Sequence, residues 1–471
     1  MDTTKTCSPG VGYLQSQVRQ FLSRFAQTGA HALSSLIQSE QLQSLMRQHC
    51  LNYRERIYSP LTTMSLFLEQ VLGADHSCQD AVARGLSGRV AQDLPASSLN
   101  TGPYCKERQR LSEALLANVC KSLGQQLCQA STQSWRWRGR EVKLVDGTTV
   151  SMPDTDLNQA AYPQSKQQKA GLGFPVMRIV GIISLGCGAV LDWAQGACAG
   201  KQTGETSMLR QLSAALTKGD IVLMDRYYAG YFMVAILLGR GADFVSRQHQ
   251  LRHTDFEQGM RLGKGDHVAL WLRPVRPKWM TPEEYEQVPL SLQIRETRVG
   301  QWVLISSLND AKAVSRQDLN ELYGWRWHVE LDIRAIKTVM QMDVLRCKTP
   351  QMVVKEVAAH LLGYNLVRSV MAQAANRIGC KPRQLSFKGA LQQLRAFEEQ
   401  LRHGAYARVA SLCEVLISAV AQMKLLHRPG RVEPRAVKRR ETNSTLLTQS
   451  RHMHRARLQV QRDLIMTAVY A

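Results

Sequence analysis

The 471-residue sequence lacks the features that mark several large classes of protein. Its 11 cysteines include no CxxC pair, so neither a zinc ribbon nor a disulfide framework is indicated, and reduced thiols fit best. Apolar runs such as YFMVAILLG fall well short of the ~20 residues that span a bilayer. The first residues, MDTTKTCSPGVGYL, lack the charged-then-apolar order of a signal peptide. We therefore expect a cytoplasmic protein with no membrane partner.

The sequence also lacks a nucleotide-binding loop. GACAGKQ is the segment most like a P-loop, but it has one residue too few between its glycines and Gln where Ser or Thr must bind Mg²⁺. Internal repeats and low-complexity tracts are missing as well. We therefore expect that the protein binds no nucleotide and folds as an ordinary globular chain.

Acidic residues are scarce relative to basic ones. The chain carries 60 Lys and Arg against 38 Asp and Glu, a formal charge of +22. Such an excess favours a polyanionic partner, because each neutralised phosphate releases counterions. Residues 331–471 alone hold 24 basic and 9 acidic side chains, which is most of the excess. The alternative is a basic surface that serves only solubility.

The spacing of apolar residues divides the chain into three regions. Residues 1–130 show mostly helical spacing and predict a helical N-terminal domain. Residues 131–376 change to alternation and then to a strand–helix–strand pattern, which predicts a mixed α/β domain. Residues 377–471 return to helical spacing and include a basic segment, 428–440, that either binds DNA or is a solvated linker.

A second alternating segment lies within the α/β region, at about residues 248–313. Leu290, Leu292 and Ile294 face one way, and the residues between them face the other. This pattern predicts an insertion of antiparallel strands.

The segment ELYGWRWHVELDIRAIKT, residues 321–338, combines aromatic and charged residues on one predicted helix. Wound at about 100° per residue, it has a solvated face with His328 and Asp332. A narrow stripe holds one acid among basic and hydroxyl groups: Tyr323, Arg326, Glu330, Arg334 and Lys337. The apolar, docking face comprises Leu322, Trp325, Val329, Ile333 and Ile336. Ordinary pairing of Arg326, Glu330 and Arg334 is the alternative explanation of the stripe.

Two further acids end predicted strands. Asp146 follows the apolar KLV and precedes a glycine that permits close backbone approach, and Asp225 ends the run IVLMD. Asp often ends a strand only to cap a turn. Chemistry collects at the carboxyl ends of strands in open α/β sheets, so Asp146, Asp225 and Glu330 are candidates for one site. Three carboxylates with oxygen donors suit Mg²⁺.

Tyr323, Arg326, Glu330 and Lys337 match, without a gap, the Tyr-x₂-Arg-x₃-Glu-x₆-Lys (YREK) motif of a group of bacterial insertion-sequence DDE transposases, which this sequence resembles. LVDGT and LMDRYY resemble the group's first and second acidic motifs, and the resemblance covers roughly residues 99–440. It implies a ribonuclease-H-like catalytic core, with an inserted β subdomain and helical flanks. In that core Asp146, Asp225 and Glu330 hold two Mg²⁺ ions, for which Mn²⁺ can substitute.

The resemblance also implies how DNA is handled. The enzyme would cleave the ends of its element, form a DNA hairpin and join the ends to a target. Tyr323, Arg326 and Lys337 would contact phosphates, and Trp302 would stack on a flipped base. A buried strand residue is the alternative reading of Trp302, and Trp271 and Trp279 are rival stacking residues. Trp325 and Trp327 are expected to pack their helix, and His328 to lie on the surface.

The expected partners are double-stranded DNA, as terminal inverted repeats and as target, and a second copy of the chain in a synaptic complex. Residues 1–130 would bind DNA, and 377–426 would supply the subunit contact. The expected location is the bacterial nucleoid. Two other classes stay open, a ribonuclease-H-like nuclease that cuts without joining and a non-catalytic DNA-binding regulator of transposition.

Overall fold

The computed structural model describes residues 39–50, 57–91, 93–200, 203–403, 406–425 and 448–470. The part of the predicted N-terminal helical domain before residue 39 and the basic segment 428–440 lie outside these ranges. The helices are α3 (Ser39–His49), α4 (Pro60–Leu72), α5 (Cys78–Val90), α6 (Thr101–Arg110), α7 (Glu113–Gln129), α8 (Asp156–Ala161), α9 (Glu205–Gln211), α10 (Tyr231–Gly239), α11 (Pro282–Glu286), α12 (Arg316–Gly324), α13 (His328–Arg334), α14 (Pro350–Arg377), α15 (Phe387–His403), α16 (Tyr406–Gln422) and α17 (Arg451–Tyr470). The strands are β1 (Val142–Ser151), β2 (Val176–Ser184), β3 (Val190–Ala197), β4 (Ile221–Met224), β5 (Asp243–Arg247), β6 (Met260–Gly263), β7 (Asp266–Leu272), β8 (Ser291–Val299) and β9 (Trp302–Ser306).

These strands form one sheet in the order β3-β2-β1-β4-β5-β9-β8-β7-β6. The first three are antiparallel neighbours, and β4 and β5 run parallel to β1. The order 3-2-1-4-5 with this pattern of directions is that of ribonuclease-H-like folds. The parallel pair β4 and β5 is joined through α10, as a crossover between parallel strands requires. The predicted α/β, ribonuclease-H-like fold class is confirmed.

The strands from residues 248–313 extend this same sheet. Strands β6 to β9 pair antiparallel with their neighbours, as the alternation predicts. Strand β9 then pairs with β5, where Arg247 lies opposite Leu304. Leu292 and Ile294 are buried, whereas Leu290 precedes β8 and is 72% exposed, so Leu290 does not continue their face of the strand. The inserted strands and the catalytic strands therefore share one continuous hydrogen-bonded ladder.

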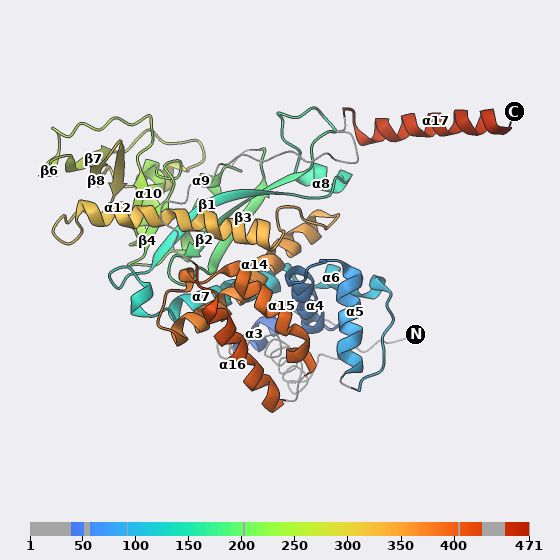
Figure 1. The fold of residues 1–471 in the computed structure, drawn as a ribbon. Helices are drawn as coiled ribbons and strands as arrows, with labels where there is room; N and C mark the ends of the chain where they lie inside the picture. Colours follow the sequence, from blue (N-terminus) through green and yellow to red (C-terminus); the bar gives the residue numbers. More distant parts are fainter. Residues whose placement is uncertain are drawn as a thin grey trace, which may run out of the picture.

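Two hydrophobic cores cover the two faces of the sheet. Consecutive residues of β1 point to opposite faces, so Leu144 packs into one core and Val145 into the other. The core that contains Leu144 continues into α3, α4, α7 and the long helix α14, which contacts α7 closely. The second core is closed by α9 and α10. Figure 1 shows α3 to α7 gathered with α14 to α16 beside the sheet, whereas α17 extends away from them.

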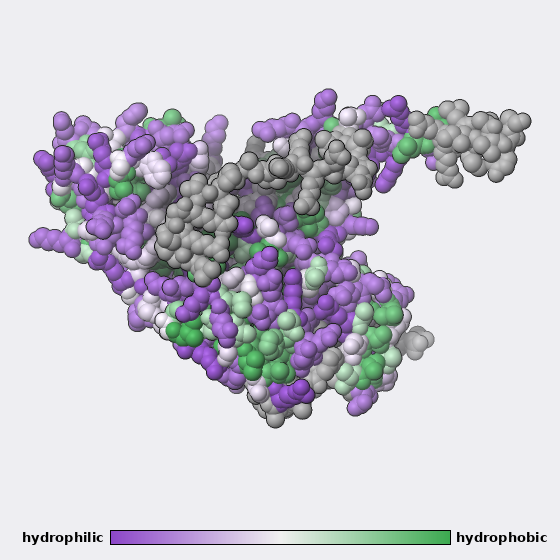
Figure 2. Space-filling view, viewed as in Figure 1, coloured by the Kyte–Doolittle hydropathy of each residue, from purple (hydrophilic) through white to green (hydrophobic). Residues whose placement is uncertain are grey.

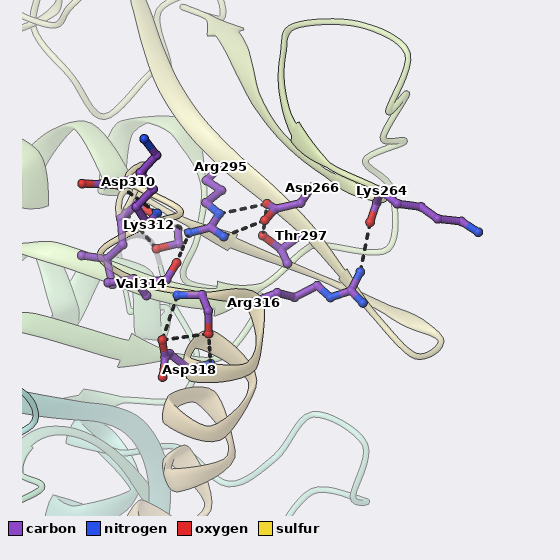
Figure 3. A network of polar contacts seen from close by, with 12 residues as sticks. Lys264, Asp266, Arg295, Thr297, Asp310, Lys312, Val314, Arg316 and Asp318 are labelled. Atoms are coloured by element: carbon purple, nitrogen blue, oxygen red, sulfur yellow. Dashed lines mark hydrogen bonds and ion pairs between the residues drawn. The ribbon is translucent and has the colours of Figure 1, made fainter.

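A buried polar network connects the inserted strands to the start of α12 (Figure 3). Arg295 is 0% exposed and donates to both carboxylate oxygens of Asp266, at 2.9 and 2.6 Å. The same guanidinium donates to the carbonyls of Leu308 and Val314, at 3.1 and 2.6 Å. Val314 immediately precedes Ser315, the residue that caps α12. A buried charge needs such complete pairing, so this network fixes where the helix leading to the site begins.

The surface reflects the composition of the chain. Figure 2 shows mainly hydrophilic side chains over the β6–β8 end, and a hydrophobic patch over the helical layer at the bottom of the view. None of the described helices is both long and apolar enough to cross a membrane. All ten cysteines in the described residues are free thiols.

Candidate active site

Strand pairing brings the two predicted aspartates to the same end of the sheet. Strands β1 and β4 are parallel, with Leu144 opposite Leu223. Asp146 and Asp225 each follow two residues later, just past the last parallel pair. Asp225 directly follows the last residue of β4, whereas β1 continues to Ser151, so the prediction that Asp146 ends its strand is wrong. Helix α13, which carries Glu330, packs against β1. The three acids thus come from one strand, the end of the next strand and one helix.

Arg326 joins two of these acids. Its Nη2 donates to Oε1 of Glu330 at 2.8 Å, and its Nη1 lies 3.5 Å from Oδ2 of Asp146. Burial by itself lowers the pKa of Arg326, but the surrounding acidic groups outweigh it and raise that pKa. The pairing therefore reaches from the helix to the strand, and is more than an exposed pair within one helix.

Asp146 sits in a partly desolvated position. Burial raises the pKa of its carboxyl to about 6, and the carboxylates of Glu205 and Glu330 act in the same direction. The backbone N–H of Gly147, which donates to Oδ1 of Asp146 at 2.8 Å, and the Arg326 guanidinium oppose this rise. Positive charge from a cation would favour the ionised form of this group.

Tyr323 lies at the edge of the same cluster. Burial raises the pKa of its hydroxyl, and nearby Asp225 adds to the rise. The Arg326 guanidinium and the backbone N–H of Arg247 lower it. Tyr323 is therefore close to the second aspartate, to Arg326 and to the end of β5.

Trp302 begins β9, next to that strand end. Its side chain is 49% exposed, and the Arg247 guanidinium lies 4.1 Å from its ring centroid. Trp302 is therefore not a buried strand residue, which was the alternative reading. Trp271 is such a residue, since it is buried and its indole N–H donates to Glu296 at 2.8 Å. Trp279 is partly buried beneath Arg210, at 3.8 Å. Among the three tryptophans, Trp302 has an open face and is linked to the site through Arg247.

Lys337 contacts β1 beyond Asp146, towards the end of the strand. Its Nζ donates to the carbonyl of Thr149 at 2.7 Å, and with Asp146 it lines a mostly apolar cavity between the sheet and the helix. Lys337 lies in a π-helical turn, residues 335–339, of the kind that often marks functional sites.

The predicted continuous helix over residues 321–338 is wrong in detail. The chain passes from α12 through a 3₁₀ turn at 325–327 into α13, and then into the π turn. The predicted docking face is confirmed. Its members are buried or packed against the core: Leu322, Trp325, Val329, Ile333 and Ile336.

The predicted solvated face is wrong at Asp332. This carboxylate is 0% exposed and forms ion pairs with Arg368 and Arg383, the latter at 2.8 Å. The helix is covered on that side by α14 and the turn before α15, which the winding of one helix cannot reveal. His328 is half-buried, and burial, followed by the nearby Arg383 charge, lowers its pKa to about 4.

Two residues near the site were not predicted. Trp327 was expected to pack the helix, but it is 48% exposed and directly follows Arg326. Glu205, the first residue of α9, accepts a hydrogen bond from the Tyr228 hydroxyl at 2.9 Å and lies against Gly147. The glycine after Asp146 did signal a close approach, although it did not identify the approaching group.

The donor chemistry of the site fits a hard divalent cation, since the acids offer only oxygen ligands. Within the described part of the chain, however, no three His, Cys, Asp or Glu side chains form a preassembled metal-binding group. The Arg326 guanidinium occupies the position between Asp146 and Glu330. It supplies there the positive charge that a bound cation would also supply.

Comparisons with known proteins show which proteins this chain resembles. The family model for the transposase DDE domain matches residues 137–366. The transposase InsG of insertion sequence element IS4 from Escherichia coli (strain K12) is 30% identical over 342 residues, covering 71% of this chain and 75% of that protein. A cryo-EM structure of the piggyBac transposase synaptic complex with hairpin DNA aligns with 88% of this chain and 87% of its own, at 10% identity and a TM-score of 0.41. The chain belongs to the DDE transposases of bacterial insertion sequences, a family of metal-dependent, DNA-binding polynucleotidyl transferases and endonucleases.

Proposed function

We propose that this transposase cleaves the ends of its insertion sequence and joins them to target DNA at the site formed by Asp146, Asp225 and Glu330. The observation that carries the proposal is the double pairing of Arg326 with Asp146 and Glu330. This pairing joins the strand and the helix that bear two of the acids. It leaves phosphate-binding groups beside the carboxylates.

Two Mg²⁺ ions, which Mn²⁺ can replace, would be held by Asp146, Asp225 and Glu330. When bound, such ions activate an attacking water or 3′-hydroxyl and stabilise the leaving 3′-oxygen. The raised pKa of Asp146 means that neutral or higher pH keeps this carboxyl ionised and able to bind a cation. Each joining step exchanges one phosphodiester for another, so no nucleotide is consumed.

The residues around Glu330 would bind the DNA backbone. Arg326 and Lys337 supply positive charge and Tyr323 a hydroxyl, the groups that commonly contact phosphates. Lys337 hydrogen-bonds only a backbone carbonyl, at 2.7 Å, so its charge is available to a phosphate. These contacts would place the scissile phosphate beside the acids.

Hairpin formation would use the open face of Trp302. A tight DNA hairpin requires a base that leaves the stack, and an aromatic face stabilises such a base by about 1–3 kcal/mol. The exposure of Trp302 and the charge of Arg247 on its ring support this role. The stacked guanidinium can also contact the adjacent phosphate.

Pairing of two element ends would require two copies of the chain in a synaptic complex. We assign residues 1–130 to DNA binding and residues 377–426 to the subunit contact. The complex would act on double-stranded DNA at the terminal repeats and the target, in the bacterial nucleoid.

The test uses linear DNA that carries the terminal repeats, incubated with the protein and Mg²⁺. Asp146→Asn, Asp225→Asn and Glu330→Gln should each abolish strand cleavage and retain binding of the ends. Glu321→Gln, an exposed acid on α12, is the matched control and should cleave normally. Full cleavage by any of the three variants would contradict the assignment of the site.

Addition of a second duplex separates the competing functions. A transposase transfers the cleaved 3′-end into that duplex, whereas a nuclease yields cut DNA without joined product. A regulator would bind the repeats and leave both strands intact.

A further inference from the structure

We propose that Glu205 is a positioning residue of this active site, which holds the part of β1 that carries Asp146 against the turn that follows Asp225. The inference rests on the proposed function, because it takes those aspartates as the reacting centre. Glu205 lies outside the motifs of the family, at the start of α9 after β3.

The first contact of Glu205 is with the backbone beside Asp146. A Cβ atom added to Gly147 would come within 2.6 Å of the Glu205 Cδ and 2.7 Å of its Oε1. In this arrangement the glutamate carboxyl occupies the space where a side chain at position 147 would begin. Gly147 is not among the glycines with positive φ, so its missing side chain matters here through this close approach and not through backbone strain.

The second contact is with the turn that contains Asp225. Tyr228 is buried at 1% exposure, and its hydroxyl donates to Oε2 of Glu205 at 2.9 Å. The backbone N–H of Tyr228 donates to the Asp225 carbonyl at 3.0 Å, which closes the turn. The buried tyrosine thus ties Glu205 to the backbone of the second acid.

Neighbouring contacts hold Glu205 in this position. Arg178 on β2 lies 3.8 Å from Oε1 of Glu205 and donates to the Thr203 carbonyl at 2.9 Å, just before α9 begins. Thr206 Oγ1 lies 3.4 Å from the Tyr227 carbonyl. Glu205 keeps 39% of its side chain exposed, so it reaches the surface of the site and is not a core residue.

The carboxyl group consequently links the part of β1 that carries Asp146 to the turn that follows Asp225. The reaction depends on the relative positions of Asp146 and Asp225. Outer contacts of this kind typically change metal affinity or activity by about 10- to 100-fold when removed. Glu205→Ala should therefore slow Mg²⁺-dependent cleavage within that range and raise the Mg²⁺ concentration needed for half-maximal rate.

Two variants separate positioning from charge. Glu205→Gln keeps an oxygen that accepts the Tyr228 hydrogen bond and should retain a rate within about three-fold of the wild type. Tyr228→Phe removes the same hydrogen bond and should resemble Glu205→Ala. The double variant should be no slower than either single variant, since both changes break one contact. Glu113→Ala, which removes the first residue of α7 far from the site, is the matched control.

Metal binding is also measured without the reaction, as the rise in melting temperature that Mg²⁺ causes in each variant. Glu205→Ala and Tyr228→Phe should need more Mg²⁺ for the same rise, with unchanged binding of terminal-repeat DNA. The positioning role would be overturned if Glu205→Ala needed no more Mg²⁺ than the wild type. It would also be overturned if Glu205→Gln were as impaired as Glu205→Ala. Failure of the proposed function would look different, because the wild-type protein itself would then not cleave the ends.

Discussion

The Arg383 guanidinium lies 2.8 Å from the Asp332 carboxylate, two residues beyond Glu330 on α13. Asp332 also pairs with Arg368, and neither oxygen reaches solvent. Asp332→Ala would leave both arginines without their counter-charge, and loss of one partner of a buried pair costs about 3–5 kcal/mol. We expect the free energy of unfolding, measured by urea denaturation, to fall by that amount.

The control for Asp332 is Asp343→Ala, which removes an exposed acid nearby in the chain. Its stability should stay within about 0.5 kcal/mol of the wild type. Equal stabilities of the two variants would show that the buried pairing does not hold α13 in place.

Stability should depend on pH through His360. This imidazole is buried, and burial lowers its pKa to about 3, with the neighbouring His76 acting in the same direction. The unfolded chain takes up a proton near pH 6.5, whereas the folded protein does not, so stability falls as pH decreases below 6.5. Between pH 6.5 and 5 the loss from this group is about 2 kcal/mol.

His360→Asn removes this titration. Denaturation at a series of pH values should show a shallower decline for His360→Asn than for the wild type. His253→Asn, at an exposed position, should keep the wild-type slope. If His360→Asn left the dependence of the free energy of unfolding on pH unchanged, burial would not lower the pKa of His360 in the folded protein.

Arg326→Lys should show that the planar guanidinium is needed. One ammonium group cannot reproduce the geometry with which Arg326 contacts both Asp146, at 3.5 Å, and Glu330, at 2.8 Å. We expect end cleavage to slow by about 10- to 100-fold, with little change in end binding. Arg334→Lys, at an exposed position at the end of α13, is the control and should cleave at the wild-type rate. Normal cleavage by Arg326→Lys would show that Arg326 contributes only its positive charge.

Trp302→Ala should impair hairpin formation more than the first nick, because only the hairpin needs a base held outside the stack. Denaturing gels of end-labelled DNA separate the two products. Trp302→Phe should restore part of the hairpin, and Trp279→Ala should leave both steps unchanged. Equal losses in nicking and hairpin formation would instead indicate a structural tryptophan.

The sequence predicts the strands and the aspartates well because their signals are local. Alternation predicts the strands around Asp146, and an acid after a buried apolar run correctly predicts Asp225 at the end of β4. The same signal is wrong for Asp146, because pairing with β2 continues β1 to Ser151. Once β1 and β4 pair in parallel, Asp146 and Asp225 must lie at one edge. The stripe of Tyr323, Arg326 and Glu330 also follows from spacing alone.

Predictions of burial and contact failed where the contact comes from a segment that is distant in the sequence. Asp332 looks solvated on an isolated helix, and only α14 and the turn before α15 supply the arginines that bury it. Arg295 looks like an outward residue of a strand, but Asp266 pairs with it from the neighbouring strand. Glu205 has no local signal, since its role comes from the approach of α9 to β1.

The continuity of the nine-stranded sheet has a mechanical consequence. Three residue pairs between β5 and β9 connect the strands that bear the aspartates to the inserted strands. Any rotation of one half against the other must break these main-chain hydrogen bonds. The shared ladder therefore holds Trp302, at the start of β9, in a fixed position relative to the strands that lead to Asp146 and Asp225.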